Sequence, residues 1–274
     1  MINQNKMTGL GPKETELIAT IGSKGLRVFT VSDVAGLLNI TNISASQIIH
    51  RLVEKRKLQR IEKAKYLLIP PEAWKIGEYT EEGIIVASQL VTPYYLSYWT
   101  ALSFHGWTEQ PSRTIFVATP KIKKAVELQG INIKFVKLHT RRFFGFGEHW
   151  VGNQKVVVAE KEKTIVDCLD QPRYCGEIVE VAKGLWNGRK DLDQGKLLKY
   201  ALKMKNGAII KRLGYLLDIL EINKPKTRKE LLKNKTPNFA LLDPGQTGST
   251  IAQNKEWSLN VNVNPKNLTE WRTH

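Results

Sequence analysis

The sequence predicts an α+β fold, with a small N-terminal unit of helices and a basic hairpin followed by a larger mixed α/β domain whose second half is helical. Two observations support this prediction. Residues 11–75 contain short helical patterns and two strand patterns, whereas residues 76–274 contain strand patterns followed by a series of amphipathic helices. A chain of 274 residues is also long enough for two domains, and residues 1–10 are expected to be flexible.

The first unit is expected to begin with one short amphipathic helix that ends at a glycine. Its apolar residues recur at helical spacing, namely Leu17, Ile18 and Ile21. An extended link follows at residues 28–30. Ser32 is the expected N-cap of a second helix, and Asn42 or Ser44 is the expected N-cap of a third, because serine and asparagine side chains accept hydrogen bonds from helix amides.

The third helix separates an apolar stripe from a polar face. The stripe consists of Ala45, Ile48, Ile49, Leu52 and Val53. The polar face carries Ser46, Gln47, His50, Arg51 and Glu54, with Ser44 at its start. Beyond this helix, strand patterns at 58–61 and 66–69 flank a lysine-rich turn. A helix, a short strand, two helices and a basic hairpin follow one another in the order of a winged helix-turn-helix.

This order of elements predicts binding to duplex DNA, because a helix fits the major groove and a basic hairpin beside it can hold phosphates. Residues 51–65 include seven basic and two acidic side chains. The predicted DNA contacts are Ser44, Ser46, Gln47, His50, Arg51, Lys55, Arg60, Lys63 and Lys65. The alternative is a protein-docking module, since charged runs also occur on surfaces that are only solvated.

Overall charge and cysteine content narrow the class of protein. A formal charge of +16 suits a polyanion or an acidic protein face. Apolar runs such as 84–91 are too short to span a bilayer, and the N-terminus lacks the apolar core of a signal peptide, so we expect a cytoplasmic protein without membrane contact. Cys168 and Cys175 do not have zinc-ligand spacing and are expected to be free thiols, with no metal and no cofactor.

A stretch with two prolines and a glycine, residues 70–80, is the expected domain boundary. Helices are then predicted at 84–90 and 94–104, the second one capped by Ser97. Strands are predicted to start at Thr114, Ile131 and Gln154. Further helices are predicted to start near Glu162, Gly176, Asp193, Asn206 and Pro225. The alternation from Trp257 to Val263 suits a strand that returns to the earlier sheet.

Enzyme activity is not expected. His105 has Ser97, Thr100 and Ser103 nearby in sequence, and Asp167 or Asp170 could orient it. The chain, however, lacks a glycine-framed nucleophile turn. His105 precedes Gly106, so we expect it to close a helix and to complement the C-terminal helix dipole.

A metal-dependent nuclease site is the second enzymatic alternative. It would need the acids Glu160, Glu162, Asp167 and Asp170 to converge. The simpler interpretation places Glu162 in the first turn of a helix and Asp167 on a polar helix face.

Basic and aromatic side chains are interleaved between residues 121 and 146. Residues 121–142 carry seven basic side chains against Glu127, and Phe143, Phe144 and Phe146 follow. This pattern suits RNA, a single strand or an acidic protein groove. The predicted partner contacts are Lys121, Lys123, Lys124, Arg141 and Arg142. The alternative is a solvated basic helix and a hairpin whose aromatic rings enter the core.

Four segments in order resemble one family. They are YLSYWTALSFHGWTEQPSRTIFVAT, EKEKTIVDCLDQPRYCGEIVEVAKGL, RLGYLLDIL and LLDPGQTGS followed by WSLNVNVN. Together they resemble the AbiEi antitoxins of type IV toxin–antitoxin systems, over essentially the whole chain. The resemblance implies a DNA-binding autorepressor. We expect residues 11–75 to bind paired half-sites of an inverted repeat in the protein's own promoter, as a homodimer on DNA. The resemblance also implies a C-terminal antitoxin domain at 76–274 that neutralises a nucleotidyltransferase-like toxin.

The family's recognition residues carry over only to the third helix and the wing. They correspond to Ser44, Ser46, Gln47, His50, Arg51, Lys63 and Lys65. Two other functions stay open at this point. One is a ligand-sensing transcriptional regulator without a toxin partner, and the other is a nucleic-acid-processing enzyme.

Overall fold

The computed structural model describes residues 9–69, 80–128, 130–246 and 248–273, and it confirms the predicted α+β class. The chain divides into two compact units. The first comprises Met1–Thr92, Lys124–Ile133 and Trp150–Val156, and the second comprises Pro93–Lys123, Lys134–His149 and Val157–His274. The predicted boundary at 70–80 lies, except for Thr80, outside the described residues. None of the described helices has the length and apolar content needed to cross a membrane.

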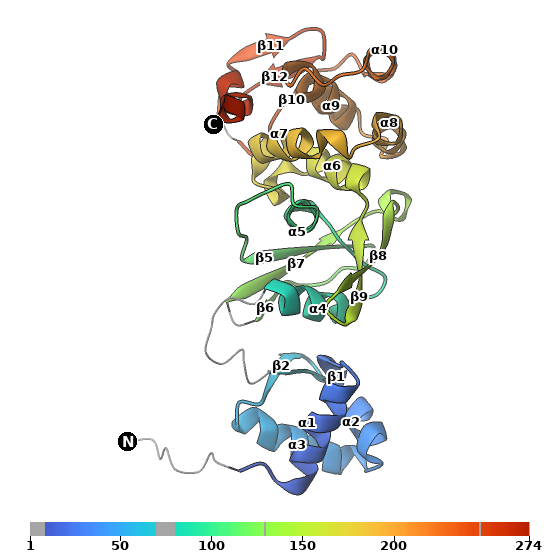
Figure 1. Cartoon of the computed structure of the whole chain (residues 1–274), viewed down its shortest axis with the longest axis vertical. Helices are drawn as coiled ribbons and strands as arrows, with labels where there is room; N and C mark the ends of the chain where they lie inside the picture. The colour runs from blue at the N-terminus through green and yellow to red at the C-terminus, as the bar shows by residue number, and fades with distance from the viewer. Residues whose placement is uncertain (1–8, 70–79, 129, 247, 274) are drawn as a thin grey trace, which may run out of the picture. The chain divides into compact units, whose positions relative to one another are not determined.

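The N-terminal part of the first unit has the element order of a winged helix-turn-helix (Figure 1). Its helices are α1 (Pro12–Ser23), α2 (Val31–Leu38) and α3 (Asn42–Glu54). Its strands are β1 (Val28–Thr30), β2 (Leu58–Glu62) and β3 (Lys65–Leu68), which form an antiparallel sheet in the order β1-β3-β2. Apolar side chains from all three helices and the sheet share one core, including Leu17, Phe29, Val34, Leu52 and Leu68.

Threonines, rather than the predicted residues, cap α2 and α3. The Thr30 hydroxyl accepts a hydrogen bond from the Asp33 amide at 3.2 Å, and the Asp33 carboxylate accepts one from the Thr30 amide at 2.7 Å. At α3 the Thr41 hydroxyl accepts from the Ser44 amide at 3.2 Å. Both threonines have extended backbone, as N-caps do, so each helix begins at the next residue. The predicted caps were therefore wrong and lie inside the helices: Ser32, Asn42 and Ser44.

Two glutamines bind backbone groups close to β1 within the first unit. Gln89 of α4 (Thr80–Leu90) accepts hydrogen bonds at Oε1 from the amides of Arg27 and Val28, at 3.0 and 2.9 Å. The Gln154 side chain donates to the Gly25 carbonyl at 3.0 Å. Strand β1 is at the edge of its sheet, so these side chains satisfy backbone groups that no strand pairs with there.

Six strands form one sheet in the order β6-β7-β5-β4-β9-β8. Its strands are β4 (Tyr95–Leu96), β5 (Thr114–Thr119), β6 (Val126–Leu128), β7 (Ile131–Lys137), β8 (Phe146–Val151) and β9 (Gln154–Ala159). Strand β4 pairs antiparallel with β5, where Tyr95 faces Ala118, and parallel with β9, where Leu96 faces Val158. Because β4 is an inner strand, the prediction of a helix over 94–104 was wrong in its first part.

Helix α5 (Tyr98–Phe104) begins directly after β4, packs against β5 and contacts α6 (Figure 1). Ser97 occupies its N-cap position as predicted, but its hydroxyl makes no cap hydrogen bond and donates to a buried carboxylate described below. Tyr98 adopts a positive φ of 55° at this turn and is fully buried. A bulky residue in this conformation is uncommon, so the strand-to-helix turn is held by its surroundings.

The second half of the chain is helical, as predicted. Its helices are α6 (Lys161–Asp170), α7 (Glu177–Asn187), α8 (Gln194–Lys203), α9 (Gly207–Ile219) and α10 (Pro225–Asn234). A small sheet follows, with β10 (Ala240–Leu241), β11 (Ala252–Asn254) and β12 (Leu259–Val261) in the order β10-β12-β11. Strand β12 pairs only inside this small sheet among the described residues, so the predicted return to the earlier sheet was wrong.

Trp257 anchors the small sheet to α9. Its ring lies so close to Gly214 that a Cβ atom at that position would be 2.1 Å from Cζ3 of the ring. Its indole nitrogen donates to the Asp218 carboxylate at 2.8 Å. Glycine at 214 is therefore required by the close approach of the ring to the α9 backbone.

Candidate nucleic-acid interface

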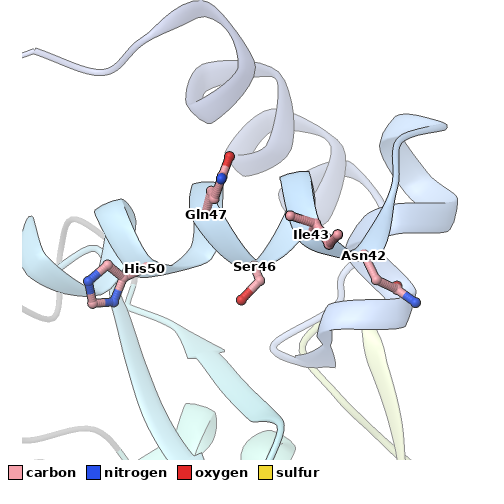
Figure 2. Close-up of a pocket in the computed structure, with 5 residues that line it drawn as sticks. All are labelled: Asn42, Ile43, Ser46, Gln47 and His50. Atoms are coloured by element: carbon pink, nitrogen blue, oxygen red, sulfur yellow. The ribbon is translucent and has the colours of Figure 1, made fainter.

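The exposed face of α3 carries five side chains that line a shallow, open hollow of 600 Å³ (Figure 2). They are Asn42, Ile43, Ser46, Gln47 and His50. Four of these side chains can donate or accept hydrogen bonds, and Ile43 is apolar. Residues 43, 46, 47 and 50 recur at the spacing of one helix face, so they project to the same side of α3.

The core fixes which way this face points. Ala45, Ile48, Ile49 and Leu52 are buried in the winged-helix core, and Val53 is partly buried against it. Because the apolar stripe is held on one side, Ser46, Gln47 and His50 are exposed on the other. The predicted division of the third helix into two faces is confirmed.

Two of the predicted DNA contacts share a buried carboxylate. Glu14 of α1 is 2% exposed, and its two oxygens lie 3.1 Å from Nε of Arg51 and 2.6 Å from Nζ of Lys55. Burial raises the pKa of Glu14, but hydrogen bonds from Lys55, the Gly11 amide and Arg51 outweigh burial and hold the pKa below its usual value. The Arg51 side chain remains 50% exposed, whereas that of Lys55 is 23% exposed. Arg51 is therefore better placed than Lys55 to reach a ligand.

The basic residues of the hairpin differ in how far they are engaged. Arg60 donates from Nε to the Glu62 carbonyl at 3.3 Å and is exposed. Lys63 is exposed at the turn, next to Ala64 with a positive φ of 61°. Lys65 lies 3.7 Å from the Glu62 carboxylate and donates to the Leu90 carbonyl at 3.3 Å. Arg60 and Lys63 are thus the wing cations most available to phosphate.

Two further predicted contacts on α3, Ser44 and His50, have side-chain partners close in sequence. The Ser44 hydroxyl lies 3.1 Å from that of Thr41, and its amide belongs to the helix cap, so Ser44 is partly occupied by capping. His50 lies 3.4 Å from the Glu54 carboxylate, and both side chains are more than half exposed. An exposed pair of this kind is weak and leaves the imidazole accessible.

Sequence reasoning missed Asn42 and Ile43 as members of this face. Asn42 was considered only as a cap, and Ile43 was assigned to neither face of the helix. The available signal was spacing, since Ile43 precedes Ser46 and Gln47 by three and four residues.

The predicted partner contacts of the larger domain do not form one uniform basic patch. Arg142 is tied to Asp170 of α6 at 3.1 Å, and Asn206 donates to the same carboxylate at 2.7 Å. Lys121 and Arg141 are exposed, and Lys123 lies over the Phe135 ring at 5.2 Å. Lys124 belongs to the first unit and the other four belong to the second.

The phenylalanines that follow this basic segment pack inward. Phe143 and Phe146 lie against the Tyr95 ring, with centroid distances of 5.2 and 5.0 Å, and Phe144 packs edge-on against Tyr200. The three phenylalanines are half-buried, so the alternative interpretation, in which these rings enter the core, holds in part. The same interpretation predicted a basic helix in this region, and that prediction was wrong. The described part of the region consists of β6, β7 and a short 3-10 turn at Thr140–Arg142.

Asp167 lies in the interior, contrary to the prediction that it occupies a polar helix face. Its carboxylate forms an ion pair with Lys163 and accepts hydrogen bonds from Tyr95 Oη at 2.9 Å and Ser97 Oγ at 2.8 Å. All four side chains belong to residues that are 0% exposed. Burial, reinforced by the negative charge of Asp167, raises the pKa of Tyr95. The hydrogen bond from Tyr95 to Asp167 joins β4 to α6. Because solvent does not reach these side chains, the cluster is not a surface site.

Two of the other acids considered for a nuclease site, Glu160 and Glu162, pair with one lysine. Glu160 accepts from Tyr200 and lies 3.2 Å from Lys196, and Glu162 is 3.2 Å from the same lysine. Glu162 lies in the first turn of α6, as predicted. Within the described residues, no group of three His, Cys, Asp or Glu side chains is arranged to hold a metal ion.

His105 is the C-cap residue of α5, so it closes this helix as predicted. Its Nε2 lies 2.9 Å from the Ala159 carbonyl at the end of β9, and its ring packs 5.1 Å from that of Trp107. Burial lowers the pKa of His105, which opposes the positive charge that a dipole interaction requires. Cys168 and Cys175 are free thiols, as predicted, and both are buried.

Comparison with known proteins adds a likeness in fold. No protein-family model matches the chain, and no curated protein sequence matches it. The crystal structure of the RV2827C protein from Mycobacterium tuberculosis is similar in fold, with a TM-score of 0.64 over 92% of each chain. The two sequences share 15% identity, so the likeness concerns the fold alone.

Proposed function

We propose that this protein is a DNA-binding transcriptional autorepressor and the antitoxin of a type IV toxin–antitoxin system. The single observation that supports DNA binding best is the exposed face of α3, where Ser46, Gln47 and His50 stand beside a core that fixes their direction. A helix presented in this way fits the major groove, where amide and imidazole groups can meet base edges.

Charge around α3 supports a nucleic acid as the partner. Residues 51–65 carry seven basic and two acidic side chains, and Arg60 and Lys63 of the wing are exposed. Cations placed beside a groove-reading helix contact phosphates and set orientation, while the helix supplies sequence discrimination. The protein then binds an inverted repeat in its own promoter as a homodimer.

The antitoxin role rests on the ordered segments that resemble the AbiEi antitoxins. All of these segments lie in the second unit, which supplies the surface for a nucleotidyltransferase-like toxin. Lys121 and Arg141 are the exposed cations we place at that contact, since a toxin that binds nucleotides or tRNA can present acidic edges to them.

Two experiments with the full chain test the two halves of the proposal. In the first, the purified protein is titrated against its own promoter fragment and against a scrambled duplex of equal length. Tighter binding to the promoter supports repression, and equal affinity for the two duplexes contradicts it. In the second, the protein is coexpressed with the product of the adjacent reading frame. Restored growth supports the antitoxin role, and unchanged growth arrest at equal protein abundance contradicts it.

A further inference from the structure

Ile43 is the one apolar residue among the five whose side chains line the hollow on α3. It is the second residue of α3, and 74% of it is exposed. Asn42, Ser46, Gln47 and His50 line the same hollow (Figure 2). The buried apolar residues of α3 contribute to the folded core, but an isoleucine this exposed contributes little to it.

The position of Ile43 is the one from which a groove-reading helix contacts bases. In helix-turn-helix proteins the N-terminal residues of the recognition helix reach the base edges. Ile43 is one turn before Gln47 on the same face, so both side chains face the same ligand. A β-branched side chain in a helix has one strongly preferred χ1 rotamer, so ordering Ile43 on a ligand costs little entropy.

The major groove offers one apolar group to such a side chain. Thymine alone presents a methyl group there, at C5, whereas the other edges present hydrogen-bond donors and acceptors. The exposed cations Arg51, Arg60 and Lys63 match the charge of a duplex and favour it over an apolar protein surface.

We propose that Ile43 packs on the 5-methyl group of a thymine in each half-site and so makes the protein select that base. This inference rests on the proposed DNA binding and adds the chemical feature that is read. Gln47, one turn further along, then pairs with an adenine through its N6 and N7 groups, because a side-chain amide matches that edge. The contacted half-site is therefore predicted to contain A·T pairs at neighbouring positions.

The test removes the methyl group without changing base pairing. The full chain is first used to select its tightest site from a pool of randomised duplexes. Each thymine of that site is then replaced in turn by deoxyuridine, and affinities are measured for the wild type and for Ile43→Ala. Ile251→Ala serves as a matched control, because Ile251 is also an exposed isoleucine, at 61%, and lies in the second unit.

At one thymine of each half-site, we expect deoxyuridine to weaken wild-type binding by about threefold to tenfold, the range for one buried methyl group. Ile43→Ala should bind the unmodified site with a similar loss and show no further loss on the deoxyuridine site. Ile251→Ala should behave as the wild type. If deoxyuridine has no effect at any position, or weakens Ile43→Ala as much as the wild type, the proposal for Ile43 is overturned while DNA binding stands. Failure of the full chain to enrich any duplex overturns both.

Discussion

Nε of Arg51 lies 3.1 Å from Oε1 of Glu14, so the exposed side of helix α3 is tied to a carboxylate that α1 holds in the interior. The other oxygen of Glu14 receives Lys55 at 2.6 Å. One acidic residue therefore holds two cations that follow the exposed polar face of α3. The same ion pairs therefore stabilise the N-terminal unit and fix the positions of Arg51 and Lys55.

Replacing Glu14 by glutamine should destabilise the protein. Glu14→Gln removes the charge that compensates Arg51 and Lys55, and we expect the free energy of unfolding at neutral pH to fall by about 1–3 kcal/mol, as for hydrogen bonds to charged groups. Urea unfolding of the full chain measures this change. Glu16→Gln is a suitable control, because Glu16 is an exposed residue on the same helix. Equal effects of the two substitutions would contradict the role of Glu14.

The same residue predicts how stability depends on pH. The folded-state pKa of Glu14 lies below its ordinary value of 4.5, so the folded protein binds a proton less readily than the unfolded chain. Its contribution to stability is therefore present above that ordinary pKa and is lost as the pH falls through the folded-state pKa. Thermal unfolding in acidic buffers should show a smaller loss of stability on acidification for Glu14→Gln than for the wild type. Parallel curves for the two proteins would exclude this contribution.

Base-reading and phosphate contacts should separate in binding experiments. Gln47→Ala should weaken binding to the preferred duplex by about 1–3 kcal/mol and leave binding to unrelated duplexes unchanged, because it removes a base contact. Lys63→Ala should weaken binding to all duplexes and flatten the dependence on salt by about one unit. Fluorescence anisotropy at several salt concentrations distinguishes the two patterns. Lys229→Ala, at an exposed lysine of α10, is the control, and a loss equal to that of Lys63→Ala would argue against the wing contact.

The buried pair of Lys163 and Asp167 should be essential for stability. Asp167→Asn leaves the Lys163 charge uncompensated inside the protein, so we expect a loss of about 3–5 kcal/mol in the free energy of unfolding. Asp191→Asn is the matched control, since Asp191 also pairs with a lysine, Lys161, at 3.4 Å, but both side chains are exposed. The control should change stability by less than about 1 kcal/mol. Wild-type stability of Asp167→Asn would refute the structural role and reopen the chemical one.

Charge reversal tests the proposed toxin surface without disturbing the fold. Lys121→Glu combined with Arg141→Glu should abolish growth rescue in cells that express the toxin, while leaving promoter binding intact. Arg142 is left unchanged, because it pairs with Asp170 and its replacement would uncover a buried carboxylate. Lys226→Glu with Lys229→Glu on α10 is the control of equal charge change. Full rescue by the Lys121 and Arg141 variant at equal abundance would place the contact elsewhere.

The sequence pattern correctly predicted the features that depend on interactions between residues close in sequence. The apolar stripe of α3 and its exposed face follow from a helical period, and the hairpin follows from strand patterns around a short turn. The caps were misjudged by one to three residues because Thr30 and Thr41 compete with neighbouring serine and asparagine for the same role. Strand β4 was mistaken for helix because its two residues pair with β5 and β9, which are distant in sequence.

The position of Asp167 was not visible in the sequence. Lys163 precedes it by four residues, a spacing that is equally typical of an exposed ion pair. Burial depends on Tyr95, Ser97 and Phe144, which come from other elements and cover the pair. Ile43 was not identified either, because its exposure depends on how the core orients α3 and not on its residue type.

The two hydrogen bonds that Gln89 accepts near β1 also determine how much of the chain an isolated N-terminal fragment must include. An open sheet edge with unpaired amides is a template for strand addition by another molecule, and proteins usually block such edges. In this chain the amides of Arg27 and Val28 are occupied by a side chain from α4. A fragment that stops at residue 75 would leave the edge of β1 open and prone to self-association. A fragment that continues through Leu90 retains Gln89, whose side chain occupies these amides.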